Sequence, residues 1–372
     1  MAATIADVAH RAHVSTATVS RVLAGLGHAR PATEERVLAA ARDLEYRPSG
    51  VARSLKRRST ETIGLIVTDI ENPYFPELVR AVEDAARADG YAILLCNAAD
   101  DPEREAGYLD LLVERRVDGL IIAAGSLGAR HLEWLASPPL PVVLVNSSAA
   151  DLDLPSIHSD DRAGGRLAAR HLLDLGHRRF GYLLPPPRCV DGPVRLAGVR
   201  DALADAELDP DSIAIASGVP LAEGGEAAML ELLDHASDVT AVLAYNDLMA
   251  IGALRAIRRR GRSVPRDISV VGFDDVALAA YVDPPLTTLS QRTTEMGHWA
   301  VERLTERLRP RRSTGATWSD PGDDRPLQGS AVMLPVRLEI RGSTGPPPRE
   351  RRWTGRAAPI PSLRVGRPHP PA

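Results

Sequence analysis

Polar and aromatic side chains follow the β-branched segments of this 372-residue chain, and their chemistry suits a small polyhydroxylated ligand. The set comprises Asp69, Asn72, Tyr74, Asn146, Asp161, Arg195, Asn246, Asp274 and Gln291. Carboxylates, amides and a guanidinium can pair with ligand hydroxyls, while Tyr74 or Phe75 can stack on the face of a ring. Because a single Asp in a loop is as readily a helix cap or a turn former, only the whole set indicates a binding site.

Catalytic motifs are missing from the sequence. We find no glycine-rich phosphate loop, no G-x-S-x-G elbow and no paired-cysteine metal motif. His10 and His13 are three residues apart but have no other ligand type close by in sequence. We therefore expect no metal ion, no cofactor and no enzymatic activity, although steady turnover of a bound metabolite would reopen the enzyme alternative.

The elements that would position these side chains alternate regularly from Thr62 onward. The predicted strands are 63–67, 92–95, 119–122, 142–145, 180–184, 241–244, 268–273, 287–289 and 333–340. The predicted helices lie near 76–89, 102–116, 161–175, 194–206, 223–235 and 247–260. This alternation is typical of parallel sheets covered by helices on both faces. Two strand sets over about 280 residues favour two α/β lobes, which bind ligands at the carboxyl ends of their strands.

The N-terminal residues predict three short helices. Thr4 can cap a first helix through Ala12, and Ser15 can cap a second from Thr16 to Leu23. A third, about 32–45, offers Val37, Leu38, Ala41 and Leu44 to a small core. The tight turn between the first two helices indicates a helix-turn-helix, whose second helix enters the major groove of DNA. The alternative is a three-helix bundle that binds no nucleic acid.

Charge distinguishes these alternatives. Residues 1–60 contain ten Lys or Arg against five Asp or Glu, and residues 343–372 contain six Arg against one Glu. The whole chain has a net charge of −4, so residues 61–342 are strongly acidic. A basic head on an acidic body favours head-first docking onto phosphates.

Residues 48–60 predict a hinge and linker. Pro48 stops the preceding helix, and Ser49 can cap a short helix that ends near Lys56. So short a helix is unstable alone in water and should order against DNA or a partner hinge. The alternative is a basic linker without a helix.

Several motifs occur together in the order of one known family. They are 4–9 (TIADVA), 14–23 (VSTATVSRVL), 46–48 (YRP) and 51–55 (VARSL), followed by 246–250 (NDLMA) and 271–275 (VGFDD). The chain thereby resembles the lactose-repressor-type (LacI/GalR) transcriptional regulators, up to about Arg341. The resemblance implies an α/β protein with a helix-turn-helix headpiece, a hinge and a two-lobed core like that of periplasmic binding proteins.

The resemblance also implies roles for individual residues on DNA. Thr16 and Ala17 would stand at base-reading positions, and Arg21 could bind guanine with two hydrogen bonds, worth ~1–3 kcal/mol of discrimination. Leu55 would enter the minor groove and open a central base step. The remaining DNA-contacting positions would be Thr4, Ser15, Thr18, Ser20, His28, Val51 and Ala52. In the same way, the polar set described above, from Asp69 to Gln291, would line an effector cleft between the lobes.

Three positions depart from the family pattern. His13 replaces the usual turn glycine, so a left-handed backbone there would be mildly strained. Ala24 replaces an asparagine that contacts phosphate, and Ser49 replaces the asparagine of the hinge. In addition, 218–221 (GVPL) lacks the aromatic that covers the ligand in many relatives, which leaves open a larger effector or a different polar metabolite.

The remaining features concern location and the ends of the core. Cys96 and Cys189, without a framework spacing, indicate core thiols in a reducing cytoplasm. The N-terminus has no apolar signal region, and no uncharged run reaches membrane length. Residues 309–330 predict a flexible insertion, and residues 343–372 predict a disordered Pro- and Arg-rich tail.

These expectations combine into one function. Residues 1–47 form a DNA-binding headpiece, 48–60 a hinge, and 61–342 a core that binds an effector and dimerises. We expect a cytoplasmic homodimeric repressor that reads a palindromic DNA operator and responds to a sugar-like or other polar effector, with no membrane partner. Whether the effector is an inducer or a corepressor stays open, and the alternative function is a small-molecule-binding protein with a vestigial head.

Overall fold

Three short helices near the N-terminus form the first packed unit of the computed structural model, which describes residues 3–23, 29–46, 59–123, 129–147, 153–308 and 331–348. They are α1 (Ile5–Ala12), α2 (Thr16–Leu23) and α3 (Pro31–Asp43). A capping box begins α1, in which Thr4 N donates to Asp7 Oδ2 at 2.8 Å and Asp7 N donates to Thr4 Oγ1. Ser15 Oγ accepts from Thr18 N at 3.2 Å at the start of α2. The predicted helices and caps are confirmed.

The small core of this unit contains Val8, Val19 and Val37, all fully buried. The prediction that Leu38 joins this core is wrong, because its side chain is 37% exposed. Val37 and Ala41, four residues apart, share the buried face of α3, and Leu38 lies one residue further round the helix. His13 caps the C-terminus of α1 with φ 52°, so this position, where the family usually has glycine, does take the left-handed conformation that is mildly strained for a residue with a Cβ.

A parallel six-stranded sheet forms the first lobe, with the strand order β11-β5-β4-β3-β1-β2. Its strands are β1 (Thr62–Val67), β2 (Ala92–Asn97), β3 (Gly119–Ala123), β4 (Val142–Val145), β5 (Ser156–Ser159) and β11 (Ala331–Leu334). Helices α5 (Tyr74–Ala88) and α12 (Thr293–Leu308) pack on one face through Leu78, Val82 and Met296. Helices α6 (Pro102–Glu114) and α7 (Ala129–Ala136) cover the other through Leu112 and Leu135.

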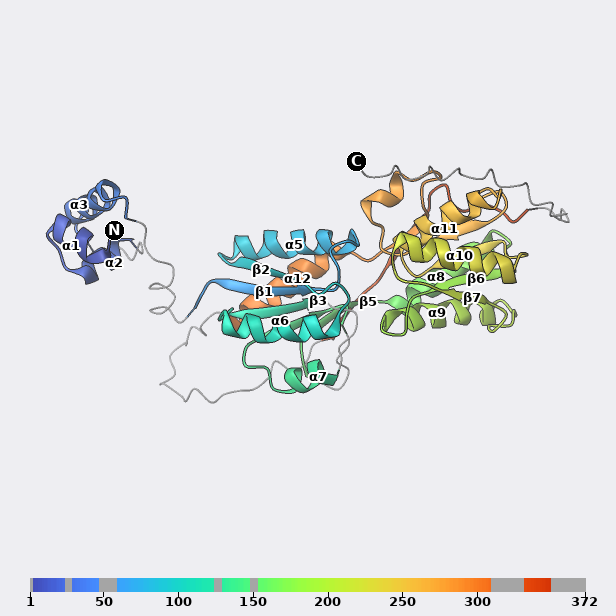
Figure 1. The fold of residues 1–372 in the computed structure, drawn as a ribbon, viewed down its shortest axis with the longest axis horizontal. Helices are drawn as coiled ribbons and strands as arrows, with labels where there is room; N and C mark the ends of the chain where they lie inside the picture. The colour runs from blue at the N-terminus through green and yellow to red at the C-terminus, as the bar shows by residue number, and fades with distance from the viewer. Residues whose placement is uncertain are drawn as a thin grey trace, which may run out of the picture.

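The second lobe repeats this architecture around a parallel sheet of order β7-β6-β8-β9. Its strands are β6 (Phe180–Leu184), β7 (Ala214–Ser217), β8 (Ala241–Ala244) and β9 (Ser269–Val271). Helices α8 (Asp161–Asp174) and α9 (Asp191–Asp205) cover one face, and α10 (Ala222–His235) and α11 (Asp247–Arg259) cover the other. A 3₁₀ helix, η1 (Ala277–Ala280), follows β9. Figure 1 shows the two lobes side by side. The predicted pair of α/β lobes is confirmed.

The chain crosses between the lobes three times. It passes from β5 to α8, from β10 (Thr288–Ser290) to α12, and from β11 to β12 (Arg337–Glu339). Strands β10 and β12 pair in an antiparallel ribbon of their own. The prediction of one strand over 333–340 is therefore wrong: Pro335 separates two strands that belong to different sheets, since proline cannot donate to a strand ladder.

Several other boundaries differ from the sequence-based expectation. Strands β5 and β7 and helices α7 and α12 were not predicted. The segment from residue 343 to residue 345 was placed in a disordered tail, yet Ser343 is fully buried and its Oγ donates to Val270 O at 2.6 Å. Gly345 N donates to Ser269 Oγ at 3.0 Å, so backbone and side-chain hydrogen bonds hold this segment beside β9. Residues 48–58 of the predicted hinge, the insertion 309–330 and residues 349–372 lie outside the described residues.

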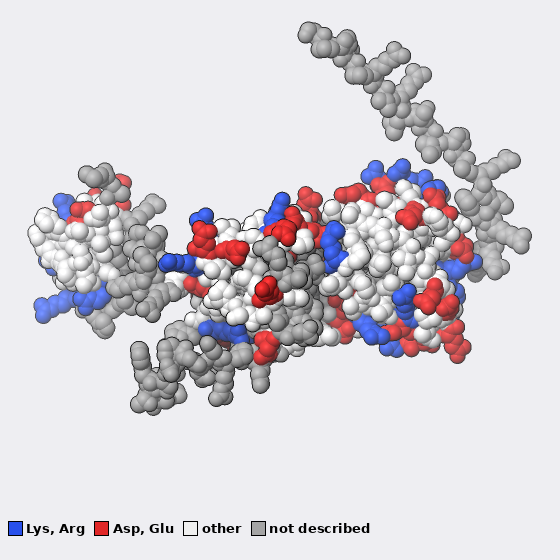
Figure 2. Space-filling view, turned by 60° about the horizontal axis from the view of Figure 1, so that its bottom comes forward, with Lys and Arg blue, Asp and Glu red and all other residues white. Residues whose placement is uncertain are grey.

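Charged side chains of both signs are interspersed over the two lobes on the face shown in Figure 2. Many are paired between neighbouring helices, as Arg162 is with Asp201 on α8 and α9 at 2.7 Å. Among the helices described, none combines enough length with enough apolar side chains to cross a lipid bilayer.

Candidate functional site

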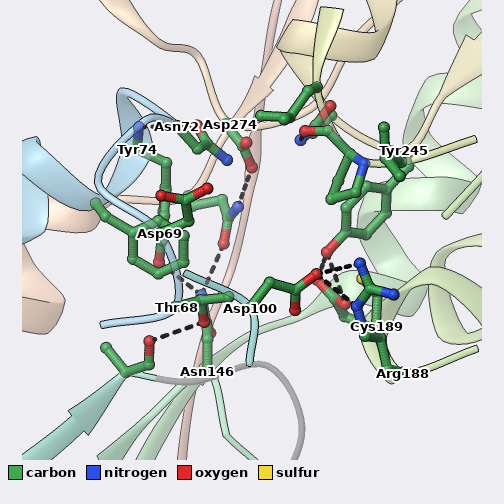
Figure 3. Close-up of a pocket in the computed structure, with 18 of the residues that line it drawn as sticks. Thr68, Asp69, Asn72, Tyr74, Asp100, Asn146, Arg188, Cys189, Tyr245 and Asp274 are labelled. Atoms are coloured by element: carbon green, nitrogen blue, oxygen red, sulfur yellow. Dashed lines mark hydrogen bonds and ion pairs between the residues drawn. The ribbon is translucent and has the colours of Figure 1, made fainter. Parts of the chain in front are cut away.

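A cavity of about 420 Å³ lies between the lobes and is lined by side chains from both. Figure 3 shows Asp69, Asn72 and Tyr74 of the first lobe facing Tyr245 and Arg188 of the second. Eight of the nine residues predicted for the ligand site line it, namely Asp69, Asn72, Tyr74, Asn146, Arg195, Asn246, Asp274 and Gln291. Its volume is within the range of natural small-molecule sites.

Asn146 organises the first-lobe wall. It follows β4 in a left-handed conformation with φ 47°, and its Nδ2 donates to Tyr74 Oη at 2.7 Å and to Gln291 Oε1 at 2.9 Å. Its Oδ1 accepts from Ser159 N at 2.9 Å, at the end of β5. Tyr74 and Phe75 pack edge to face with their ring centroids 5.2 Å apart. The network fixes the orientation of one aromatic face toward the cavity.

Arg195 organises the second-lobe wall from the first turns of α9. Its Nε donates to Asp161 Oδ1 at 2.8 Å and its Nη2 donates to Asp191 Oδ2 at 2.9 Å. Its guanidinium also lies 3.7 Å from the ring centroid of Phe273 and 4.7 Å from that of Tyr245. Although burial lowers the pKa of Arg195, Asp161 and Asp191 together hold that pKa well above its ordinary value. The side chain therefore carries a buried, fully ionised charge.

Asp274 and Gln291 connect the two walls where the chain crosses between lobes. Gln291 Nε2 donates to Asp274 Oδ1 at 2.5 Å, and Gln291 Oε1 accepts from Ser159 Oγ at 2.8 Å. Burial raises the pKa of Asp274 to about 7, against the opposing effects of Arg195 and Gln291. A carboxyl with this pKa can donate or accept a hydrogen bond near neutral pH.

Two predicted residues have clear structural roles. Asp161 does not line the cavity, and it instead holds Arg195 from behind. Burial raises the pKa of Asp161 to about 6 despite the neighbouring Arg195. Asn246 lines the cavity but also caps α11, since its Oδ1 accepts from Met249 N at 2.9 Å and its Nδ2 donates to Pro220 O.

The sequence-based set missed several cavity residues, among them Asp100, Arg188, Asp191, Glu223 and Tyr245. Asp100 follows β2 and Arg188 follows β6, so the rule that found Asp69 at the end of β1 applied to them as well. Figure 3 shows Asp100 reaching across to Arg188, where Arg188 Nε donates to Asp100 Oδ2 at 2.5 Å. This ion pair joins the two lobes at the cavity.

Tyr245 supplies an aromatic surface that the segment 218–221 lacks. Val219, Pro220 and Leu221 line the cavity without an aromatic ring, as the sequence predicted. The Tyr245 hydroxyl is held by Asp191, to which it donates at 2.9 Å. The cavity thus has Tyr74 and Phe75 on one side and Tyr245 on the other.

Within the described part of the chain, no group of His, Cys, Asp or Glu side chains has the arrangement to hold a metal ion. Cys96 and Cys189 are both buried free thiols, and Cys189 lines the cavity beside Arg188. Burial raises the pKa of Cys189 to about 12, so the thiol remains protonated and unreactive at neutral pH.

The headpiece exposes the residues predicted to meet DNA. Thr4, Ser15, Thr16, Ala17 and Arg21 are exposed, with the last four at or within α2. Thr18 and Ser20 are half-buried, and Ser15 Oγ lies 3.0 Å from Thr18 Oγ1. His28, Val51, Ala52 and Leu55 lie outside the described residues. The first turn of α2 therefore presents hydroxyls on the surface of the headpiece.

Comparison with known proteins agrees with both parts of this architecture. Residues 4–49 match the family model described as bacterial regulatory proteins, lacI family, and residues 169–344 match that of the periplasmic binding protein-like domain. The HTH-type transcriptional repressor PurR of Haemophilus influenzae (strain PittEE) is 38% identical over 308 residues, which cover 82% of this chain and 91% of that protein. CytR of Escherichia coli (strain K12), also an HTH-type transcriptional repressor, is 37% identical over 92% of this chain and 96% of its own length.

Solved structures agree as well. The lac repressor dimer bound to operator and an anti-inducer is 30% identical, covers 93% of this chain and all of its own, and superposes with a TM-score of 0.81. The complex of the regulator CelR with cellobiose is 32% identical over 92% of this chain and 99% of its own, with a TM-score of 0.65. From its headpiece to its second lobe, the chain belongs to the lacI family of bacterial regulatory proteins.

Proposed function

We propose that this protein is a homodimeric transcriptional repressor that binds a palindromic operator and responds to a small polyhydroxylated effector held between its lobes. Its relatives PurR and CytR are named transcriptional repressors, and the lac repressor structure holds operator DNA as a dimer. A repressor that binds bacterial DNA works in the cytoplasm, and we infer that location here.

The proposal rests on one observation: the same chain contains an exposed helix-turn-helix and a polar cavity between two lobes. Thr16 and Arg21 of α2 would contact base edges, and Ser15 would contact a phosphate. Thr4, Thr18 and Ser20 would add backbone contacts. The corresponding roles of His28, Val51, Ala52 and Leu55 follow from the family resemblance.

The effector would lie between two aromatic walls, with Tyr74 on one side and Tyr245 on the other. Amides and carboxylates such as Asn72, Asp69 and Asp274 would bind its hydroxyl groups. CelR holds cellobiose and an Enterococcus faecium relative holds ribose, so polyhydroxylated ligands do occur in this fold.

Control would come from movement of one lobe against the other about the three chain crossings. Rotation there would change the spacing of the two hinges in a dimer, and with it the affinity for the operator. By linkage, an effector that weakens operator binding must itself bind more weakly to the operator complex, by the same factor.

Selection from random duplex DNA by the purified full-length chain at near-physiological salt tests the proposal. We expect enrichment of a two-fold symmetric site with half-sites about one helical turn apart. Weak, steeply salt-dependent binding without a preferred sequence would instead favour a small-molecule-binding protein with a vestigial head, an alternative to which the strained His13 turn gives some support.

A further inference from the structure

Acidic side chains outnumber basic ones around the cavity. Its lining includes the five acids Asp69, Asp100, Asp191, Glu223 and Asp274. Among the described residues, two basic side chains line it, Arg188 and Arg195. Whether the cavity can bind an anionic ligand therefore depends on whether either guanidinium is free to form an ion pair with it.

Both guanidinium groups are already neutralised by the protein. Arg195 is shared between Asp161 and Asp191, at 2.8 Å and 2.9 Å, and is stacked on Phe273. Arg188 is paired with Asp100 from the opposite lobe. In the part of the chain that the structure describes, neither Asp69 nor Glu223 has an arginine in ion-pair contact. Among its described lining residues, the cavity therefore has more acidic than basic side chains, and both of its arginines are already paired with carboxylates.

From this charge distribution we propose that the effector site takes a polyhydroxylated molecule without a phosphate group and rejects the phosphate monoester of the same molecule. The inference rests on the proposed function, since it describes the ligand of that same cleft. A phosphate dianion buried here would lose its hydration beside carboxylates that repel it, while both arginines that could bind it are already paired. Hydroxyl groups meet no such penalty, because carboxylates and amides accept their protons directly.

The pair between Asp100 and Arg188 makes this selectivity adjustable. Neutralising Asp100 removes one negative charge from the lining and releases the Arg188 guanidinium, the group best suited to bind phosphate. Asp100 lies in the loop before α6, and Asp101 rather than Asp100 caps that helix, so we expect its replacement by the isosteric asparagine to preserve the fold. Asp100 is therefore a residue that determines specificity against phosphorylated ligands.

Matched ligand pairs test the proposal by calorimetry on the full-length protein. The panel contains ribose with ribose 5-phosphate, glucose with glucose 6-phosphate, and cytidine and adenosine with their 5′-monophosphates. We expect at least one unphosphorylated member to bind, and its monoester to bind at least 100-fold more weakly. In Asp100→Asn, the ratio of the monoester's dissociation constant to that of the unphosphorylated molecule should fall at least tenfold. The control Glu71→Gln removes the same charge from an exposed side chain near the cavity but outside its lining, and it should leave the ratio unchanged.

Each outcome decides something different. Equal or tighter binding of a monoester overturns the inference and leaves the proposed repressor intact. An unchanged ratio in Asp100→Asn, with a thermal transition like that of the wild type, overturns the role of Asp100. No binding by any member, with or without phosphate, counts against a polyhydroxylated effector and therefore against both the proposed function and this inference.

Discussion

At the scale of single residues, Arg195 joins the interior of the second lobe to the effector cavity. Replacing it with alanine leaves Asp161 and Asp191 without their common partner in a largely buried place. Losing one member of a buried ion pair typically costs about 3–5 kcal/mol, so we expect Arg195→Ala to lower the free energy of unfolding of the second lobe by this amount. Urea unfolding followed by circular dichroism and by tyrosine fluorescence measures it, because Tyr182 and Tyr245 lie in the second lobe. The effector response should be lost with it.

The matched control is Arg162→Ala, which breaks an ion pair between the same two helices, α8 and α9. Arg162 and Asp201 are 62% and 33% exposed, so water screens their interaction and its loss should destabilise the protein far less than the loss of Arg195. If the two variants had the same free energy of unfolding, the ion pairs of Arg195 with Asp161 and Asp191 would stabilise the protein no more than an exposed pair does.

Asp274 predicts a dependence of stability on pH. Burial raises its pKa in the folded protein to about 7 from an ordinary value of 3.8, so the folded state binds more protons than the unfolded state between these values. The stability due to this group is therefore present at low pH and is lost as the pH rises toward 7. We expect Asp274→Asn to match the wild type near pH 4 and to exceed its free energy of unfolding by roughly 2–4 kcal/mol at pH 8.

Urea unfolding at intervals between pH 4 and pH 8 checks this. The asparagine keeps an oxygen that can accept from Gln291 Nε2, so packing changes little. Stability curves that run parallel for the two proteins across the whole range would show that Asp274 titrates normally.

At the scale of elements, the turn between α1 and α2 contains backbone strain that one substitution can remove. His13 has φ 52° and ψ 49°, a conformation that costs a residue with a Cβ about 1–2 kcal/mol and glycine almost nothing. We expect His13→Gly to stabilise the helix-turn-helix by about 1 kcal/mol, observed as slower amide hydrogen exchange in α1 and α2 of the full-length protein. His13→Ala should show no such gain, and equal protection in all three proteins would contradict the strain argument.

Elements were predicted correctly where their own residues and immediate neighbours define them, and were missed where contacts with distant parts of the chain define them. Strand β6 was predicted with its observed bounds because its largely apolar segment is bounded by Arg178 and Arg179 on one side and by the prolines 185–187 on the other. Strand β5 was missed because only Ile157 among its four residues is apolar, and because one of its two pairing partners, β11, lies far away in sequence. Helix α12 has apolar residues at helical spacing, Met296, Ala300 and Leu304, so its existence could have been predicted. Its packing on the first lobe could not, because the chain crossing that brings it there has no local sequence pattern.

The same distinction applies to the site. Residues that follow predicted strands, such as Asp69 and Asn146, were placed correctly because the carboxyl ends of parallel strands converge. The contact between Asp100 and Arg188 could not be predicted, since it depends on how the two lobes face each other. Likewise, only the packing of α8 against α9 shows that Asp161 supports Arg195 rather than lining the cavity.

At the scale of the whole molecule, the three crossings hold the lobes together while Asp100 and Arg188 tie them across the cavity. Opening the cleft breaks this ion pair, so removing it should shift the protein toward the open form. Because both side chains are partly exposed, the pair contributes at most about 1 kcal/mol, or roughly a fivefold change in an equilibrium. We expect Asp100→Asn and Arg188→Gln each to change operator affinity by up to about this factor, in the same direction, and the double variant to change it no further.

Fluorescence anisotropy with the operator obtained by selection measures all four proteins, with no effector present. Equal shifts in the two single variants and the double variant are the expected signature of one lost pair, because the second substitution then removes nothing more. Salt weakens DNA binding in all four proteins, so affinities are compared as ratios to the wild type at the same salt concentration. Because salt also screens the ion pair, each ratio should move toward one as the salt concentration rises. If the shift in the double variant were instead the product of the two single shifts, each side chain would act on its own, and closure of the lobes would depend on other contacts.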